Sequence, residues 1–265
     1  MPGISNSEIK RIRSLSVKKF RDLTGLFTVE GEKMVSEAMK SSFHVEKVYR
    51  AGDIGQEAMS RISSLSSPSP VLAVVRKPDD IAASPGEGMM KALARAGRTG
   101  GDLCGGLFLA LDTIRDPGNL GTILRIADWF GIDAVFASHD TVDVFNPKVV
   151  QSTMGAIFRV RFHYTDIPSL ASSVLSAGGK VYGTFLDGYD IYSRELDTGD
   201  VYPSVIVIGN ESEGISPAVA GLVSDRLFIP PYPAGDPGSE SLNAAVATAV
   251  TVAEFRRRNI MKGRF

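Results

Sequence analysis

The segment Val205–Ser216, which reads VIVIGNESEGIS, has the residue types and the spacing of a ligand-binding loop. A β-branched run ends at Gly209, a short polar loop follows, and Ser216 with the proline after it predicts a helix start. In α/β proteins a buried strand, a glycine loop and a helix together form a ligand crevice at the carboxyl end of the sheet.

The same loop imitates a phosphate-binding loop but lacks the cation that such a loop needs. Gly209 and Gly214 have the GxxxxG spacing, whereas Ile215 stands where a phosphate loop requires lysine. The carboxylates of Glu211 and Glu213 lie inside the loop and would repel a polyphosphate. We therefore expect this loop to bind a neutral or cationic ligand.

Two further polar segments follow apolar runs. Residues 113–121 open a helical pattern, and the segment after Ile229 passes through a proline-rich turn before a second helical pattern. The first helix has apolar residues at i, i+3, i+4 and i+7, which predicts a buried stripe of Ile123, Ile126, Ala127 and Phe130. Arg125 lies off that stripe, so the pattern alone leaves it as either a surface ion-pair residue or a functional cation.

The elements that would position these loops form an α/β pattern. Apolar runs alternate with helical patterns in the second part of the chain, which predicts a mainly parallel sheet with functional residues in the loops after its strands. The six runs are Leu107–Asp112, Ala134–Ser138, Phe158–Tyr164, Val181–Leu186, Val205–Gly209 and Arg226–Pro230.

The first part of the chain predicts a small α/β unit of its own. Its helical patterns cover residues 7–22, 32–40 and 55–65, and its strands are expected at Phe27–Val29, Val45–Tyr49 and Val71–Val75. A stretch rich in glycine and small residues then resembles an interdomain linker. The predicted division is a first domain at 1–83, a linker at 84–106 and a second domain at 107–265.

The net charge of −1 selects no partner, but basic residues gather at both ends of the chain. Such clusters either bind a phosphate backbone by releasing counterions or are ordinary solvated helix faces. At the carboxyl end they are Arg256, Arg257, Arg258, Lys262 and Arg264. At the amino end they are Lys10, Arg11, Arg13, Lys18, Lys19 and Arg21.

The composition narrows the class of protein. The one cysteine, Cys104, excludes an internal disulfide, and the three histidines have no metal-ligand spacing, so we expect no metal site. No apolar run has transmembrane length, and the amino end has no signal-peptide pattern, so we expect a cytoplasmic protein without a membrane partner.

Several motifs together resemble the SpoU RNA 2′-O-ribose methyltransferases of the SPOUT superfamily. The three that carry the resemblance are Asp116–Gly121 with Arg125, Ile208–Ser216, and Ile229-Pro230 with Glu240–Asn243. The stretches Asn146–Lys148 and Ser152–Ala156 also resemble the family, and Phe27–Gly31 is similar to the substrate-binding domain of many members. The order of these motifs on the expected loops makes the resemblance specific.

The resemblance implies an α/β domain with a deep trefoil knot that binds S-adenosylmethionine and forms a homodimer with the active site at the interface. By position it implies a catalytic set of Asn119, Arg125, Glu211 and Asn243, with Ser241 nearby. It also implies a cofactor site lined by Gly209, Asn210, Ile229, Pro230 and Leu242. The stretch between Ile229 and Ser241 looks longer than the loop usual in the family, which changes the expected cofactor contacts there.

The family assigns the position of Arg125 as a general base, but a guanidinium remains protonated below about pH 12. The alternative is that Arg125 holds a phosphate and stabilises the developing alkoxide. Ribosomal RNA is the favoured substrate because of the first domain, with transfer RNA as the alternative. A rival from another class is an RNA-binding protein that has lost methyl transfer, and the motifs oppose a dehydrogenase or NTPase.

Overall fold

The computed structural model describes residues 4–79, 81, 105–199, 201–233 and 240–261. Their contacts divide the chain into two compact units. Unit 1 comprises residues 1–79 together with 142–159, and unit 2 comprises residues 80–141 together with 160–265. Residues 84–104 of the predicted linker lie outside the described residues.

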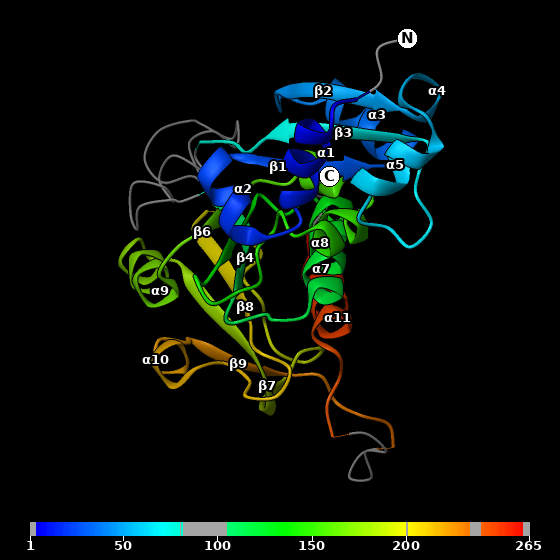
Figure 1. The fold of residues 1–265 in the computed structure, drawn as a ribbon. Coiled ribbons are helices and arrows are strands. Elements are labelled where there is room, and N and C mark those ends of the chain that lie inside the picture. Colours follow the sequence, from blue (N-terminus) through cyan, green and yellow to red (C-terminus); the bar gives the residue numbers. More distant parts are fainter. Residues whose placement is uncertain (1–3, 80, 82–104, 200, 234–239, 262–265) are drawn as a thin grey trace. The chain divides into compact units, whose positions relative to one another are not determined.

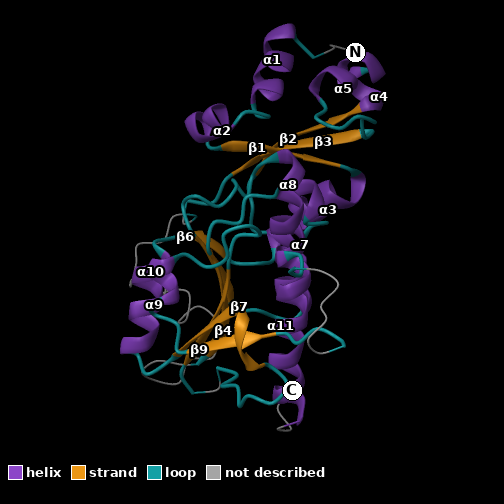
Figure 2. Ribbon diagram, turned by 90° about the horizontal axis from the view of Figure 1, so that it is seen from below, coloured by secondary structure: helices purple, strands orange, loops and turns teal. Residues whose placement is uncertain are grey.

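Unit 1 is built on an antiparallel sheet in the order β1-β3-β2. Its central strand is an uninterrupted apolar run because both faces of the sheet are covered. Figure 2 shows α1 and α5 over one face and α3 with α8 over the other. The elements are α1 (Asn6–Ser14), α2 (Lys18–Thr24), β1 (Leu26–Glu30), α3 (Glu32–Lys40), β2 (Val45–Arg50), α4 (Ala51–Ile54), α5 (Gln56–Ile62), β3 (Val71–Arg76) and α8 (Pro147–Ser152).

The expected strands of unit 1 are confirmed, but the expectation of one helix over residues 7–22 is wrong. The chain turns at Leu15–Val17 and forms the two helices α1 and α2. Leu15 is buried in the core, and the carbonyl groups of Leu15 and Ser16 both accept hydrogen bonds from the Arg21 guanidinium. Tertiary packing therefore interrupts a pattern that is locally helical.

Unit 2 contains a six-stranded sheet in the order β6-β5-β4-β8-β7-β9, and every neighbouring pair in it is parallel. This confirms the predicted α/β class. Helices α7 and α11 cover one face, and α9 with α10 covers the other (Figures 1 and 2). The elements are β4 (Gly106–Leu111), α7 (Pro117–Trp129), β5 (Ala134–Ala137), β6 (Phe162–Tyr164), α9 (Ile167–Ser176), β7 (Lys180–Asp190), β8 (Pro203–Ile208), α10 (Pro217–Ala220), β9 (Asp225–Phe228) and α11 (Ala244–Met261).

Two details of unit 2 differ from the expectation. The strand predicted at Phe158–Tyr164 begins only at Phe162, because Phe158 belongs to unit 1, where it lies in a 3-10 turn with its ring 5.2 Å from that of Phe43. The buried stripe of α7 is Leu120, Ile123, Leu124 and Ala127, whereas Ile126 and Phe130 are only partly buried. The stripe starts earlier because the helix itself starts at Pro117.

Candidate active site

The loop after β4 is shaped by its own helix cap. Asp116 is the N-cap of α7, Pro117 occupies the first helical position, and the Asp116 carboxylate accepts a hydrogen bond of 2.7 Å from the Asn119 backbone N–H. Ile114 is fully buried and anchors the loop to the core. Asn119 is thus held in the first turn of α7, and Asp116 acts structurally.

The loop after β8 is closed by its own backbone. Asn210 and Gly214 exchange two backbone hydrogen bonds of 2.9 and 3.0 Å. A Cβ atom at Gly209 would lie 2.3 Å from the carbonyl carbon of Gly214, so only glycine permits this close return. The resulting turn presents Glu211 to solvent.

Asn210 holds this loop together. Its Oδ1 accepts hydrogen bonds from the N–H groups of Ser212 (2.9 Å) and Glu213 (3.1 Å), and its Nδ2 donates to the Thr113 carbonyl at 2.8 Å. The residue is buried, and its backbone groups pair with Gly214. These bonds give Asn210 a structural role in the loop, and its place in the lining of the cofactor site stays a prediction.

Three of the predicted catalytic residues meet in a directed chain of hydrogen bonds. Asn243 Nδ2 donates to Asn119 Oδ1 at 2.8 Å, and Asn119 Nδ2 donates to Glu211 Oε1 at 2.6 Å. We call this chain the Asn243–Asn119–Glu211 relay. It joins the start of α11, the first turn of α7 and the loop after β8, three segments far apart in sequence.

The direction of the relay follows from a helix cap. Asn243 Oδ1 accepts hydrogen bonds from the N–H groups of Ala245 (3.0 Å) and Val246 (3.3 Å) at the start of α11. The other end of that amide must then be a donor, which makes the facing atom of Asn119 an acceptor. Asn119 is left with its Nδ2 toward Glu211, and a carboxylate is the natural end of such a chain.

The two carboxylates of the loop after β8 are in different situations. Glu213 has an exposed ion pair with Arg115, with 3.7 Å between the charged atoms. Glu211 has a neutral amide partner, Asn119, and no ion pair with any residue that the structure describes. The Glu211 carboxylate therefore retains the capacity to accept a cationic group.

Arg125 is exposed on α7, six positions after Asn119. It makes no hydrogen bond or ion pair to the described part of the chain, so the ordinary alternative of a surface ion pair has no support here. The structure does not bring its guanidinium into contact with the relay.

The remaining predicted site residues lie at the two ends of the segment after β9. Ile229 and Pro230 are partly buried, whereas Ser241 and Leu242 are exposed. Ser241 makes no side-chain hydrogen bond within the described residues. The middle of the loop that the sequence suggested to be long, residues 234–239, lies outside the described residues.

The sequence interpretation did not identify an irregular part of β7 that lies near the site. Strand β7 pairs with β8 and then extends to Asp190, with an irregularity between Thr184 and Tyr189 where it pairs with β9. Gly188 (φ 133°) marks the irregularity, since a Cβ atom there would lie 2.5 Å from the Arg226 carbonyl oxygen. Because this part of β7 continues past the residues that pair with β8, toward the carboxyl ends of the strands, it lies at the same edge of the sheet as Glu211.

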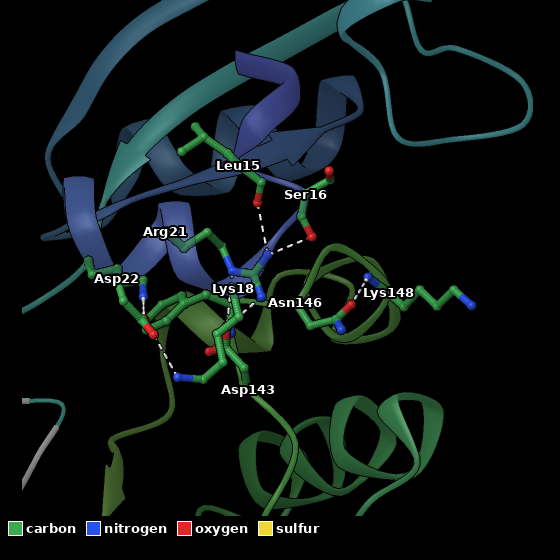
Figure 3. Close-up of polar contacts among 10 residues, drawn as sticks. Leu15, Ser16, Lys18, Arg21, Asp22, Asp143, Asn146 and Lys148 are labelled. Carbon is green, nitrogen blue, oxygen red and sulfur yellow. Dashed lines mark hydrogen bonds and ion pairs between the residues drawn. The ribbon is translucent and has the colours of Figure 1, made fainter. Parts of the chain in front are cut away.

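Arg21 contradicts the expectation that the whole amino-terminal cluster contacts RNA. It is only 1% exposed, and its guanidinium is bound to Asp143 and to the carbonyl groups of Leu15 and Ser16, as Figure 3 shows. These hydrogen bonds use four of the five guanidinium N–H donors, and burial keeps the group from reaching a phosphate. The expectation is therefore wrong for Arg21.

The other amino-terminal cations are exposed. Arg11 pairs with Glu46 at 3.7 Å and Lys18 pairs with Asp22 at 2.7 Å. The cations that have no ion pair with a described residue are Lys10, Arg13 and Lys19.

The carboxyl-terminal cluster is largely structural. Arg256 donates to the carbonyl groups of Phe130 and Gly131 and so closes the end of α7. Arg257 and Arg258 both bind Glu254, and the hydrogen bond from Arg257 lowers the pKa of that carboxyl. Lys262 and Arg264 lie outside the described residues.

Among the described residues, no group of three or more His, Cys, Asp or Glu side chains is arranged to hold a metal ion. No helix in that same part of the chain is both long and apolar enough to span a bilayer.

Comparison with known proteins decides the family. Residues 106–253 match the model of the SpoU rRNA Methylase family, and residues 6–77 match an MRM3-like substrate binding domain. The chain belongs to the SpoU rRNA methylase family. As a member it is an RNA methyltransferase, and the residues of the relay are those that carry the motif resemblance.

Relatives and solved structures cover nearly the whole chain. A Bacillus subtilis 23S rRNA (guanosine(2553)-2′-O)-methyltransferase, RlmP, is 30% identical over 95% of this chain and 96% of its own length. Human mitochondrial rRNA methyltransferase 3 is 24% identical over 93% of this chain and 70% of its own. The structure of an AdoMet-bound rRNA methyltransferase from Sinorhizobium meliloti is similar, with a TM-score of 0.79, 26% identity and 97% coverage of both chains.

Proposed function

We propose that this protein transfers a methyl group from S-adenosylmethionine to a ribose 2′-hydroxyl of large-subunit ribosomal RNA. The observation that carries the proposal is the Asn243–Asn119–Glu211 relay at the carboxyl edge of the sheet. The chain aligns over almost its full length with a relative that is named a 23S rRNA 2′-O-methyltransferase, which supports ribosomal RNA over transfer RNA as the substrate.

The residues at the site fit the cofactor. S-adenosylmethionine supplies an electrophilic methyl group on a sulfonium cation, and the Glu211 carboxylate has no cationic partner among the described residues. No lysine stands in the loop to favour a polyphosphate. We assign Gly209, Asn210, Ile229, Pro230 and Leu242 to the walls of the cofactor site.

The side chains of this chain orient the ribose and handle its proton. Methyl transfer would form the bond between the methyl carbon and the ribose 2′-oxygen, break the bond between that carbon and the cofactor sulfur, which leaves as a neutral thioether, and pass the hydroxyl proton to water. Alignment of the reactants alone can contribute about 7–11 kcal/mol to lowering the barrier. The relay would hold its hydrogen-bond donors and acceptors beside the ribose 2′-hydroxyl. Ser241 lies two positions before Asn243, the first member of the relay.

We propose that Arg125 holds a substrate phosphate and stabilises the developing alkoxide. Its exposed guanidinium, without a carboxylate partner in the described residues, is available for an anion. The alternative is proton removal by Arg125. The exposed cations Lys10, Arg11, Arg13, Lys18 and Lys19 of unit 1 would contact the RNA backbone.

We propose that the protein is a cytoplasmic homodimer with a knotted domain. Support for the dimer comes from large apolar side chains that are exposed on α7 and α11, namely Trp129 (84% exposed), Val246 (49%) and Ile260 (54%). Analytical ultracentrifugation would test the dimer, and a monomer at micromolar concentration would contradict it. The division into a substrate-binding domain at 1–83, a linker at 84–106 and a methyltransferase domain at 107–265 stays a proposal.

The function is tested by mapping ribose methylation in total RNA from cells with and without the gene. We expect one large-subunit site to lose its methyl group. Loss at a transfer RNA position would support the alternative substrate. An unchanged map, with no binding of S-adenosylmethionine by titration calorimetry, would favour an RNA-binding protein that has lost catalysis.

A further inference from the structure

The connection between β5 and β6, which we call the crossover segment (residues 142–159), packs in an unusual place. A crossover between parallel strands normally lies on its own sheet. Here it belongs to unit 1, where α8 packs on β1 and the Phe145 ring lies 4.7 Å from that of Phe27. A piece of the methyltransferase family match is thus folded into the substrate-binding unit.

The start of the crossover segment is held by a buried ion pair. Arg21 Nε and Nη2 donate to Asp143 Oδ2 at 2.9 and 2.6 Å, and both side chains are almost fully buried (Figure 3). Arg21 Nη1 also donates to the carbonyl groups of Leu15 (2.8 Å) and Ser16 (2.9 Å). The planar guanidinium makes all of these bonds at once, which lysine cannot do.

The other side of Asp143 organises the segment itself. Its Oδ1 accepts a hydrogen bond of 3.1 Å from the Phe145 backbone N–H. One carboxylate therefore joins the turn between α1 and α2 to the turn that precedes α8. Each of its oxygens is in use, so the position of Asp143 is strongly determined.

Two residues before Asp143, the chain is tied to the catalytic loop. Thr141 Oγ1 lies 3.1 Å from Ser138 Oγ and donates to the Leu111 carbonyl at 3.4 Å. Since the Thr141 proton is engaged there, Ser138 donates to Thr141 and accepts the 2.9 Å hydrogen bond from the Thr113 backbone N–H.

Thr113 connects these hydrogen bonds to the active site. It has a φ of 63°, a conformation that a β-branched residue keeps only when its surroundings enforce it. Its carbonyl accepts the hydrogen bond from Asn210, and it begins the loop that carries Asn119. A change at Thr141 would therefore alter loops that contribute two members of the relay.

We propose that Arg21 and Asp143 are positioning residues that couple the substrate-binding unit to the catalytic loop. They fix the start of the crossover segment, and through Thr141 and Ser138 they stabilise the strained Thr113 and the Asn119 loop. Arg21 acts without contacting RNA. The kinetic part of this inference rests on the proposed methyl transfer.

The test compares Arg21→Lys, Asp143→Asn and Ser138→Ala with Arg50→Lys. Arg50 makes an exposed ion pair with Glu32 at 3.2 Å in the same unit, so its variant is a matched control for losing a guanidinium. Thermal unfolding and circular dichroism establish that each variant is folded. We expect kcat to fall about tenfold in the first three variants, since a misplacement of about 1 Å can cost a hundredfold. The dissociation constants for RNA and S-adenosylmethionine should change less than about threefold.

The double variant Arg21→Lys/Ser138→Ala distinguishes coupling from two separate defects. If the residues act through one another, the double variant is about as slow as the slower single variant. A multiplied loss of about a hundredfold would overturn the inference. So would a variant Arg21→Lys that binds RNA poorly but turns over normally at saturating RNA.

Hydrogen exchange gives a readout that does not require activity. Amides of residues 113–121 should exchange faster in Arg21→Lys and Asp143→Asn than in the wild type and in Arg50→Lys. If no RNA is methylated but this exchange still responds, the proposed function fails and the coupling stands. Unchanged exchange in these amides would overturn the coupling.

Discussion

Replacing Asn243 with Asp reverses a hydrogen bond of the relay while it preserves the helix cap. Aspartate caps a helix as well as asparagine does, and its charge is favourable at a helix N-terminus, so α11 should remain intact. An ionised aspartate has no donor for Asn119 Oδ1, which now accepts a 2.8 Å bond from Asn243. Asn119 must then either face a carboxylate with its oxygen or turn its oxygen toward Glu211.

The expected loss of rate follows from one lost hydrogen bond and from the repulsion between Asn119 Oδ1 and the new carboxylate. Loss of a hydrogen bond that leaves a polar partner unsatisfied costs about 1–3 kcal/mol, which corresponds to about a 5- to 150-fold loss of rate. Asn243 and Glu211 are exposed, so water will reduce the penalty before RNA binds. We therefore expect kcat/KM to fall about tenfold, with the melting temperature within about 2 °C of wild type.

A second substitution provides the internal control. In Asn243→Asp/Glu211→Gln, the glutamine can donate to Asn119 Oδ1, and Asn119 Nδ2 can donate to the new aspartate, so all hydrogen bonds are remade in the opposite direction. Calorimetry should find cofactor affinity still reduced, because the new glutamine lacks the carboxylate that faces the cationic cofactor, and wild-type affinity in this double variant would show that Glu211 acts through its hydrogen bond alone. Wild-type rates of RNA methylation in Asn243→Asp alone would refute the catalytic role of the relay.

Three further groups of substitutions test other parts of the site and fold. Arg125→Ala should leave the unfolding free energy within about 0.5 kcal/mol, because the side chain is exposed, but lower methylation at least about a hundredfold; near-normal activity of Arg125→Lys with a shifted pH–rate profile would argue against a strict base role. Gly209→Ala sets a methyl carbon 2.3 Å from Gly214 and should abolish cofactor binding in calorimetry, whereas Gly221→Ala, 3.6 Å from the Pro217 carbonyl oxygen, should not. Burial raises the pKa of Tyr49 and of Tyr182 to about 12, so the folding stability linked to these two groups is complete below about pH 10 and is lost as pH rises through about 12. Replacing either tyrosine with phenylalanine should reduce the change in ultraviolet absorbance between those pH values. An absorbance titration identical to that of the wild type would contradict this assignment.

The sheet of unit 2 and the polar turns after its strands were predictable because they depend on local signals. Each strand is an apolar run that ends in a polar turn, and parallel order places those turns on one edge. Asn119 and Asn243 both lie at helix starts, where the sequence supplies caps and turn residues. The motif resemblance then identified which of the many polar turn residues belong together.

The crossover segment was not predictable, because its partners lie in another part of the sequence. Nothing local in residues 142–159 indicates that Phe145 will pack on Phe27 or that Asp143 will meet Arg21. The same holds for Gly209, for which two explanations fit the sequence equally well. A close approach of cofactor and a close return of backbone both require glycine, and the 2.3 Å distance to Gly214 establishes the second.

Burial is what separates the functional cations of this chain from the structural ones. By type and position Arg21 belongs to the cluster expected to contact RNA, and Arg256 belongs to a second such cluster. The fold uses the first to join α2 to the crossover segment and the second to close α7. Arg125, which the helical pattern alone would assign to an ordinary surface ion pair, is exposed and has no partner among the described residues. A cluster of basic residues therefore predicts an RNA contact only for those members that the fold leaves exposed, which in the amino-terminal cluster are Lys10, Arg11, Arg13, Lys18 and Lys19; of these, Lys10, Arg13 and Lys19 have no ion pair with a described residue.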